Sequence, residues 1–484
     1  MLKPCPLSSM ALACCLVLSG CAALGPDFHA PTTEGAVPAQ FARQQADGGV
    51  HLTMLSRRDV RDPAFWSQFG DAQLTQLVQQ ALERNHELGA AVARLQSAQA
   101  MLTHTQMDRF PTATMSGRAT QQKLSTDETS PGQARSTRSY SAGMAASWEL
   151  DWLGRVRRSV ESDAAQVSAS QADLEALQIV IAAQVADAYV QLRGAQTRLQ
   201  LAQAAEQNQR DTWQLVERRL QAGSATDLDL SRARAQLQTT QARIPGLQTQ
   251  IAAQQHRLAV LAGQSPDSLI AALATASPLP AIPPMLDPGS PADMLRRRPD
   301  IAAAEARLHS ATARIGVATA DLFPQLSLGA LLGSFTLAGN DLFTGRAANA
   351  SLFLGIDWSF LDVGRVRARI AASEAGAAQA LAQYQQSVLL ALEETENALV
   401  QVQRNSEEWA ALDEAATQRD QSAQLAQRMY QGGSLSLFEV LDAQREQLAA
   451  QDAKAQSQIN AVRSSIGLYK ALAGAWAPAT HSNG

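Results

Sequence analysis

Cysteine and histidine, the residues that most often carry chemistry, are not arranged here as a catalytic or metal site. All four cysteines (Cys5, Cys14, Cys15 and Cys21) fall within the first 21 residues, so no disulfide framework or thiol nucleophile is expected further along. The seven histidines are scattered, and none lies three or four residues from another, as zinc ligands on a helix would. GxxxxGK[ST], HExxH and GxSxG motifs are lacking, as is a GxGxxG after a strand. No enzymatic activity, metal or cofactor is therefore expected.

The charge balance excludes one class of partner, and the composition favours one type of structure. The 484 residues include 40 Lys+Arg and 45 Asp+Glu, a formal net charge of −5. No basic excess is available to neutralise phosphates, which argues against nucleic-acid binding. With 5% aromatic residues and abundant Ala and Gln, the chain is expected to form long helices.

The chemistry that the sequence does offer is lipidation of Cys21. Residues 1–20 carry one charge and then an apolar stretch too short to cross a bilayer, which predicts a cleaved secretory signal. The tetrapeptide Leu18–Cys21 resembles the bacterial lipobox, in which the mature cysteine receives an S-diacylglycerol and an N-acyl chain. A plain signal peptide with a chance cysteine is the alternative. Since Ala22 stands where Asp would retain a lipoprotein at the inner membrane, the lipoprotein interpretation predicts the outer membrane of a Gram-negative cell.

The sequence contains two tandem copies of one unit. Trp148 and Trp358 are 210 residues apart, as are Gly223 and Gly433, and the two Phe-Pro pairs at 110 and 323 are 213 apart. Landmarks in the same order at a near-constant offset indicate a duplication. The predicted divisions are a signal peptide (1–20), a lipid-anchored extension (21–64), repeat 1 (65–275), a Pro-rich linker (276–290), repeat 2 (291–474) and a tail (475–484).

Each repeat contains two segments in which apolar and polar residues alternate. These predicted hairpins, 112–148 and 325–358, have strands of roughly 9–10 residues, the length that crosses a bilayer at a tilt. Aromatic residues gather near the strand ends: Phe110, Trp148, Trp152, Phe323, Phe353, Trp358 and Phe360. Soluble hairpins packed on a helical domain are the alternative, but the lipobox and the aromatic ends favour the membrane. Because four strands cannot close a barrel, a membrane-spanning sheet requires several chains to pool their strands.

Very long helices are predicted around the strands. One is expected at Gln73–Asp108 and another at Arg155–Gln221, whose 67 positions could extend about 100 Å. Apolar residues recur every seven positions, which indicates a supercoiled packing seam; they are Val160, Val167, Leu174, Ile181 and Ala188, with counterparts Ile370, Ala377, Tyr384, Ala391 and Ala398. Return helices are expected at Leu228–Ala262 and Leu437–Ala473, with a kink or break at Pro245-Gly246 in the first.

Several motifs resemble those of a known family. Arg297-Arg298-Pro299-Asp300 matches its RRPD signature, and the stretches 313–324 and 258–263 continue the pattern, as does the start of the mature chain at 21–28. On these motifs the chain is identified as an outer-membrane efflux lipoprotein of the NodT-type, TolC-like channels.

The resemblance implies a fold and an assembly. Three copies would share a twelve-stranded transmembrane β-barrel, with four strands from each chain, and a periplasmic α-barrel made of the helical hairpins. The trimer would dock on a periplasmic adaptor and an inner-membrane pump of the resistance-nodulation-division (RND) class, and would passively conduct drugs or other small molecules outward. The outlet of a type I protein secretion system, which shares the fold, is the alternative. A periplasmic adaptor is disfavoured, since it would need one hairpin flanked by β-rich domains.

The resemblance also points to an aperture at the turns of the helical hairpins. Acidic residues ring this aperture in the family, and the matching positions here are Asp227, Asp229, Glu439 and Asp442. Tyr430 matches a tyrosine that helps to hold some relatives closed, whereas Leu435 replaces a basic partner found in some of them. The alternative is that Thr226 or Asp227 caps the return helix, and for Asp227 a cap is favoured over an aperture. The cap explanation is weaker for the other three carboxylates.

Overall fold

The structure is a computed structural model that describes residues 23–31, 37–42, 63–130, 132, 134–282, 289–337 and 339–473. The predicted signal peptide, Cys21, most of the predicted extension and the predicted tail lie outside these residues. The chain divides into two compact units. The first unit takes its described residues from the stretches 1–32, 93–171 and 303–385, and the second takes the remainder.

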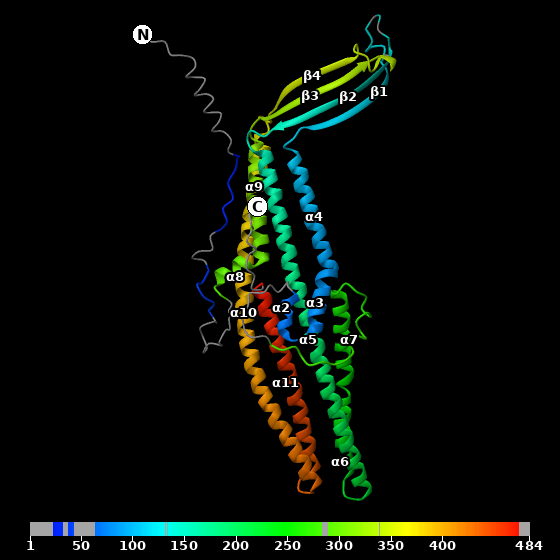
Figure 1. Cartoon of the computed structure of the whole chain (residues 1–484), viewed down its shortest axis with the longest axis vertical. Helices are drawn as coiled ribbons and strands as arrows, with labels where there is room; N and C mark the ends of the chain where they lie inside the picture. The colour runs from blue at the N-terminus through cyan, green and yellow to red at the C-terminus, as the bar shows by residue number, and fades with distance from the viewer. Residues whose placement is uncertain are drawn as a thin grey trace, which may run out of the picture. The chain divides into compact units, whose positions relative to one another are not determined.

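The first unit contains one four-stranded antiparallel sheet, in the order β1-β2-β3-β4 (Figure 1). The strands are β1 (Thr112–Lys123), β2 (Ser136–Leu150), β3 (Gln325–Thr336) and β4 (Ala348–Asp357), and a short 3-10 turn, η2 (Gly339–Asp341), lies between the last two. Three of the strands, at 12, 15 and 12 residues, are longer than the predicted 9–10. Pairing continues past the apolar positions as far as Lys123 opposite Ser136, because ladder hydrogen bonds need no apolar side chain.

The sheet has two open edges and an uncovered apolar surface. Among the described residues, β1 pairs only with β2 and β4 only with β3. Large apolar side chains are left exposed on the edge strands, with Met115 at 86%, Leu352 at 74% and Ile356 at 65% of full exposure. One expected aromatic position was wrong. Phe353 does not lie at a strand end but in the middle of β4, with its ring over Gly329 of β3.

Tryptophans at corresponding places tie each hairpin to the chain that enters it. The indole Nε1 of Trp148 donates to the carbonyl of Arg109 at 3.0 Å, and that of Trp358 donates to the carbonyl of Leu322 at 3.1 Å. Both acceptors lie between a helix and the first strand of the hairpin. The two repeats therefore build this corner with the same hydrogen bond.

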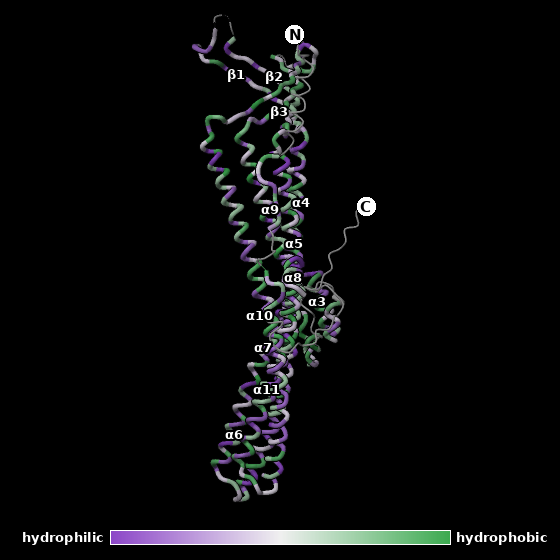
Figure 2. Tube along the Cα trace, turned by 90° about the vertical axis from the view of Figure 1, so that its left-hand side faces the viewer, coloured by the Kyte–Doolittle hydropathy of each residue, from purple (hydrophilic) through white to green (hydrophobic). Residues whose placement is uncertain are grey.

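Four long helices connect to the strands. They are α4 (His86–Met107), α5 (Arg155–Gln221), α9 (Pro299–Ala320) and α10 (Val363–Gln431). All ten predicted seam positions are buried or half-buried, so the seven-residue repeat correctly identified the packed side of α5 and α10. Hydrophilic and hydrophobic residues are interspersed along the helices (Figure 2). Of the helices in the described ranges, none combines the length and apolar character needed to cross a membrane.

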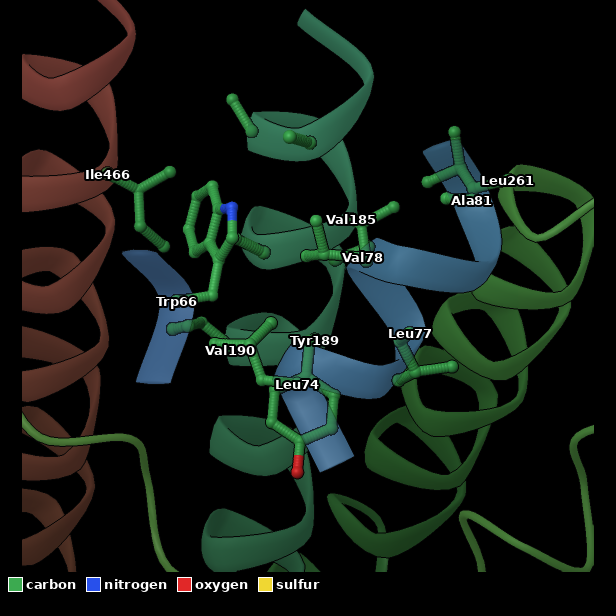
Figure 3. Packing of buried hydrophobic residues seen from close by; sticks show 14 of the residues in the cluster. Trp66, Leu74, Leu77, Val78, Ala81, Val185, Tyr189, Val190, Leu261 and Ile466 are labelled. Carbon is green, nitrogen blue, oxygen red and sulfur yellow. The ribbon is translucent and has the colours of Figure 1, made fainter. Parts of the chain in front are cut away.

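The second unit holds the main apolar core. The elements that lie wholly within it are α2 (Pro63–Trp66), η1 (Ser67–Phe69), α3 (Ala72–Arg84), α6 (Asp227–Gln241), α7 (Ile244–Leu261), α8 (Pro291–Arg297) and α11 (Leu437–Ala471). Trp66 is fully buried and lies between Ile466 of α11 and helix α5 (Figure 3). Its ring stacks on Phe69 at 5.4 Å between centroids. Phe65, Trp66, Phe69 and Tyr469 form one aromatic cluster. This cluster packs α2 and η1 against α11 and α5.

The helix boundaries confirm one prediction and correct another. The first return helix is interrupted, since α6 ends at Gln241 and α7 begins at Ile244 with Pro245 in its first turn. The single helix predicted over Gln73–Asp108 was wrong, because the chain breaks at Asn85. The Oδ1 atom of Asn85 accepts hydrogen bonds from the amides of Glu87 and Leu88 at 2.8 and 3.2 Å. An Asn side chain that caps a new helix competes with continuation of the old one.

The second arginine of the RRPD signature, Arg298, is buried and organises a network of ion pairs with partly exposed partners in the second unit. Arg298, between α8 and α9, donates to Asp300 and to Glu394 of α10, both at 2.8 Å, and to the carbonyl of Ala471 at 2.7 Å. Lys470 donates to the other oxygen of Glu394 at 3.0 Å. Burial alone would raise the pKa of Glu394, but the hydrogen bonds and charges of Arg298 and Lys470 outweigh burial and lower the pKa. Arg298 therefore joins the start of repeat 2 to α10 and to the end of α11.

Removing this guanidinium should destabilise the second unit. Arg298→Met leaves Glu394, which is 35% exposed and still paired with Lys470, with one cation fewer and the Ala471 carbonyl without this donor, so we expect a loss of about 1–2 kcal/mol in unfolding free energy. Circular dichroism melts of the detergent-solubilised protein measure it. Arg296→Met is the matched control, since the Arg296 side chain is 72% exposed and only approaches Asp293 at 3.5 Å. Equal melting of the two variants would contradict the assigned role.

Candidate functional site at the helical hairpin turns

Both helical hairpins of the second unit turn with the same backbone geometry. In the first turn, Ser224 N donates to Arg219 O at 2.8 Å and Gly223 N donates to Leu220 O at 2.9 Å. In the second turn, Ser434 N and Gly433 N make the corresponding bonds at 3.0 Å. The two glycines have φ values of +73° and +76°, the left-handed conformation that closes a helix C-terminus. The sequence repeat thus specifies two equivalent turns.

Two of the four predicted aperture carboxylates are capping residues. The Asp229 carboxylate accepts from Thr226 N at 3.1 Å and from Thr226 Oγ1 at 2.7 Å, and Asp229 N donates back to that hydroxyl. The Glu439 carboxylate accepts from Ser436 N at 2.9 Å and Ser436 Oγ at 2.7 Å. The view that a capping role is weaker for Asp229 and Glu439 was therefore wrong. A cap does not discharge either carboxylate, so both still place negative charge at the turns.

The other two carboxylates differ in their surroundings. Of the two predicted cap candidates, Thr226 is the N-cap and Asp227 is the exposed first residue of α6. The cap prediction is therefore confirmed for Thr226 and wrong for Asp227. Asp442 forms an ion pair with Arg445, three residues along α11. Its charge is partly neutralised by this neighbour, which the spacing in the sequence could have indicated.

Tyr430 lies at the meeting point of the two hairpins. It belongs to an apolar cluster that we call the turn cluster: Val216, Ala233, Tyr430, Leu437, Val440 and Leu441. The guanidinium of Arg219, at the end of α5, lies 4.3 Å from the centre of the Tyr430 ring. Leu435 packs on the edge of this cluster, so an apolar contact occupies the place where a basic partner was considered. The cation beside Tyr430 comes instead from the other hairpin.

Sequence reasoning missed the basic residues at the turns. Besides Arg219 and Arg445, Arg232 of α6 lies 5.6 Å from the ring centre of Phe438 on α11. Phe438 and Leu228 occupy matching positions in the two repeats and are 58% and 57% exposed. Contacts between separate hairpins have no signal in a single sequence, which explains why Arg219 and Arg232 were overlooked.

No metal site is evident in the part of the chain that the structure describes, where no three His, Cys, Asp or Glu side chains converge. Cys21 lies outside the described residues.

Comparison with known proteins identifies the class. The model of the family described as "Outer membrane efflux protein" matches residues 77–264 and 291–474. The chain is 32% identical to the pyoverdine export outer membrane protein OpmQ of Pseudomonas putida, over 96% of this chain and 97% of that protein. It is 32% identical to nodulation protein T of Rhizobium leguminosarum bv. trifolii, over 89% of each. The solved structure of the outer-membrane channel OprN superposes with a TM-score of 0.84 at 39% identity, covering 93% of this chain and 99% of that one.

The fold and these matches define a TolC-like outer-membrane channel, whose helices belong to a helical barrel and whose four strands belong to a β-barrel. The chain belongs to the outer membrane efflux protein family, in its NodT-type branch. It is an efflux channel of the outer membrane of Gram-negative bacteria, with a periplasmic helical domain. Members of this family are channels rather than enzymes.

The turn glycines provide a test of the hairpin geometry. Gly433→Ala should cost about 1 kcal/mol of stability, because a Cβ strains a residue at positive φ. A Cβ at Gly433 would meet no atom within 4 Å, so the cost comes from the backbone alone. Gly432→Ala is the control, since Gly432 does not have a positive φ and a Cβ there makes only ordinary contacts. Thermal unfolding of both variants checks this, and equal melting temperatures would refute the assigned geometry.

Proposed function

We propose that three copies of this chain, each anchored by lipid on Cys21, form the exit duct of a tripartite efflux system. A periplasmic adaptor and an inner-membrane RND pump would deliver drugs or other small molecules to the duct, which conducts them passively. The curated relatives support export as the role, and OpmQ bears pyoverdine export in its name. The observation that carries the proposal is the four-stranded sheet with both edges open.

The open edges support assembly through the strands. Each edge strand has one row of backbone N–H and C=O groups that pairs with no other strand in the described part of the chain. In a bilayer each unpaired group costs several kcal/mol. Pairing β1 of one copy with β4 of the next satisfies both rows at once. Three copies supply twelve strands, an even number within the range of outer-membrane barrels.

The helices of the second unit support the same assembly. On α10, Leu389, Leu390 and Leu425 are 62%, 52% and 52% exposed. The same helix already buries or half-buries its seam residues. An apolar surface of this kind is suited to a neighbouring copy of the same helix bundle.

We place the gate at the hairpin turns. Symmetry would repeat Asp227, Asp229 and Glu439 in every copy, which creates a negative constriction that attracts cations. Asp442 contributes less because Arg445 pairs with it. The contact between Arg219 and Tyr430 links the ends of α5 and α10, so it opposes separation of the hairpins and hence opening.

Glu439 should control ion preference. Hydrogen bonds from Ser436 lower the pKa of Glu439 below its usual value of 4.5, so its charge, and the preference it confers, persist as the pH falls to 4.5. A unit charge about 6 Å from a passing ion in water attracts a cation, and repels an anion, by roughly 0.7 kcal/mol. Glu439→Gln removes one such charge from each copy, so it should reduce cation-over-anion permeability at least about tenfold. Asp442→Asn should reduce it less. Planar-bilayer recordings across pH measure both effects, and Ser436→Ala should move the loss of preference to higher pH.

An unchanged permeability ratio in Glu439→Gln would exclude this residue from the constriction. The Asp442→Asn variant serves as the matched control, because it removes a carboxylate three residues away that has a cationic neighbour.

The contact between Arg219 and Tyr430 should hold the channel closed. A cation over an aromatic face contributes about 1 kcal/mol, so Arg219→Met should increase the open fraction about fivefold in single-channel recordings. Tyr430→Phe keeps the ring and should behave like the parent. Arg218→Met, one residue away and exposed, is the control. Equal opening in the Arg219→Met and Arg218→Met variants would show that the contact has no part in gating.

A further inference from the structure

The described residues closest to the N-terminus are held firmly by the first unit. Leu24 N donates to the carbonyl of Leu153 at 3.0 Å, in the short link between β2 and α5. Phe28 stacks on His309 of α9, with 4.3 Å between ring centres and 12° between planes. His309 in turn contacts Glu161 of α5 at 2.8 Å. The six residues 23–28 thus contact α9 of repeat 2 through Phe28, and they contact α5 of repeat 1 through Arg158, described below.

The approach of this segment to α9 depends on two glycines. Gly25 has φ +90°, and a Cβ there would lie 2.4 Å from the Cα of Gly316. A Cβ on Gly316 would lie 2.5 Å from the carbonyl oxygen of Leu24. Backbone meets backbone at this point, so neither residue can carry a side chain without displacing the segment.

Arg158 of α5 makes the central polar contact. Its side chain is only 5% exposed. It donates through Nε to Leu24 O at 3.1 Å and through Nη2 to Asp27 Oδ1 at 2.6 Å, while Nη1 donates to Glu161 at 2.8 Å. Nη2 also donates to Gly25 O at 3.4 Å. A buried guanidinium needs such partners, and three of these four bonds go to the N-terminal segment.

The duplication provides an internal control for these contacts. At the 210-residue offset, Ala368 and Ala371 occupy the places of Arg158 and Glu161. At the 213-residue offset, Gln96 and Thr103 occupy the places of His309 and Gly316. Flanking residues agree between the repeats, such as Arg94 with Arg307 and Arg157 with Arg367. The repeats therefore differ at the positions that hold the N-terminal segment.

We infer that residues 23–28 form a clasp, held by Arg158, that fastens the anchored N-terminus to α5 and α9 beside the β2–α5 link. Only the lipid anchor in this inference rests on the proposed function. The clasp contacts do not involve Cys21. Two peptide links join Ala23 to Cys21, a reach of no more than about 8 Å. A lipid on Cys21 would thus be held close to the end of β2 instead of at the end of a long linker.

Cross-linking in native membranes tests the clasp. Leu24→Cys and Leu153→Cys place two thiols beside the backbone hydrogen bond, and in the mature chain the other cysteine is Cys21. A short bis-methanethiosulfonate reagent should join them efficiently in the parent protein. Adding Arg158→Ala should lower the cross-linked fraction about tenfold, because three hydrogen bonds from the guanidinium to the segment are lost. Arg158→Lys should give an intermediate value, since an ammonium cannot reproduce the fork of the guanidinium.

Matched variants make the result decisive. Arg369→Ala removes an arginine of the same unit that pairs with Asp321 at 3.1 Å and should leave the cross-link unchanged. Ala368 occupies the place of Arg158 in repeat 2, so Arg158→Ala installs a residue that this position tolerates there. Should that variant accumulate poorly, Asp27→Asn and Phe28→Ala remove clasp contacts from the segment itself and should also reduce cross-linking. Undiminished cross-linking in Arg158→Ala, or in both segment variants, would overturn the clasp.

The mass of the N-terminal peptide separates the two proposals. A diacylglyceryl and acyl increment on Cys21 supports lipidation whatever the cross-link does. A free Cys21 with an efficient, Arg158-dependent cross-link would refute the anchor and retain the clasp.

Discussion

The requirement that backbone hydrogen-bonding groups be satisfied in lipid governs this molecule. A chain that contributes four strands leaves two edges unpaired, and in hydrocarbon those edges are more costly than any side-chain contact could offset. The sheet is consequently incomplete within one polypeptide. The exposed apolar residues of β1 and β4 and of α10 have the same explanation, because each is suited to a neighbour or to lipid rather than to water.

The duplication meets this requirement by using one structural unit twice. Each repeat supplies one hairpin of strands, one tryptophan hydrogen bond to the corner that enters it, and one helical hairpin closed by a left-handed glycine. Where equivalent positions in the two repeats hold different residues, a contact made in one repeat has no counterpart in the other. Arg298 and Asn85 occupy equivalent positions, yet Asn85 caps a helix while Arg298 joins α10 to α11. The Arg158 clasp is likewise confined to one repeat.

Much of the architecture could be predicted from the sequence, because it depends on periodicity and on local turn chemistry. Seven-residue spacing located the buried side of α5 and α10, alternation located the strands, and Pro245 marked the break between α6 and α7. The errors have a common cause. The break at Asn85, the position of Phe353 over Gly329 and the pairing of Arg219 with Tyr430 depend on which segments meet in space. At the turns, the residue types were informative but their roles were not, since a carboxylate three residues after Ser or Thr serves a cap and a constriction equally well.

Hydrogen exchange of the edge strands tests the central claim most directly. In the protein reconstituted into lipid nanodiscs, every amide of Thr112–Lys123 and Ala348–Asp357 should exchange as slowly as those of β2 and β3, since both rows of each edge strand have partners in a closed assembly. Protection of alternate amides only, with the outward row of β1 and β4 exchanging as fast as the loop at 124–130, would mean that the sheet remains open and that the chain does not form a shared channel.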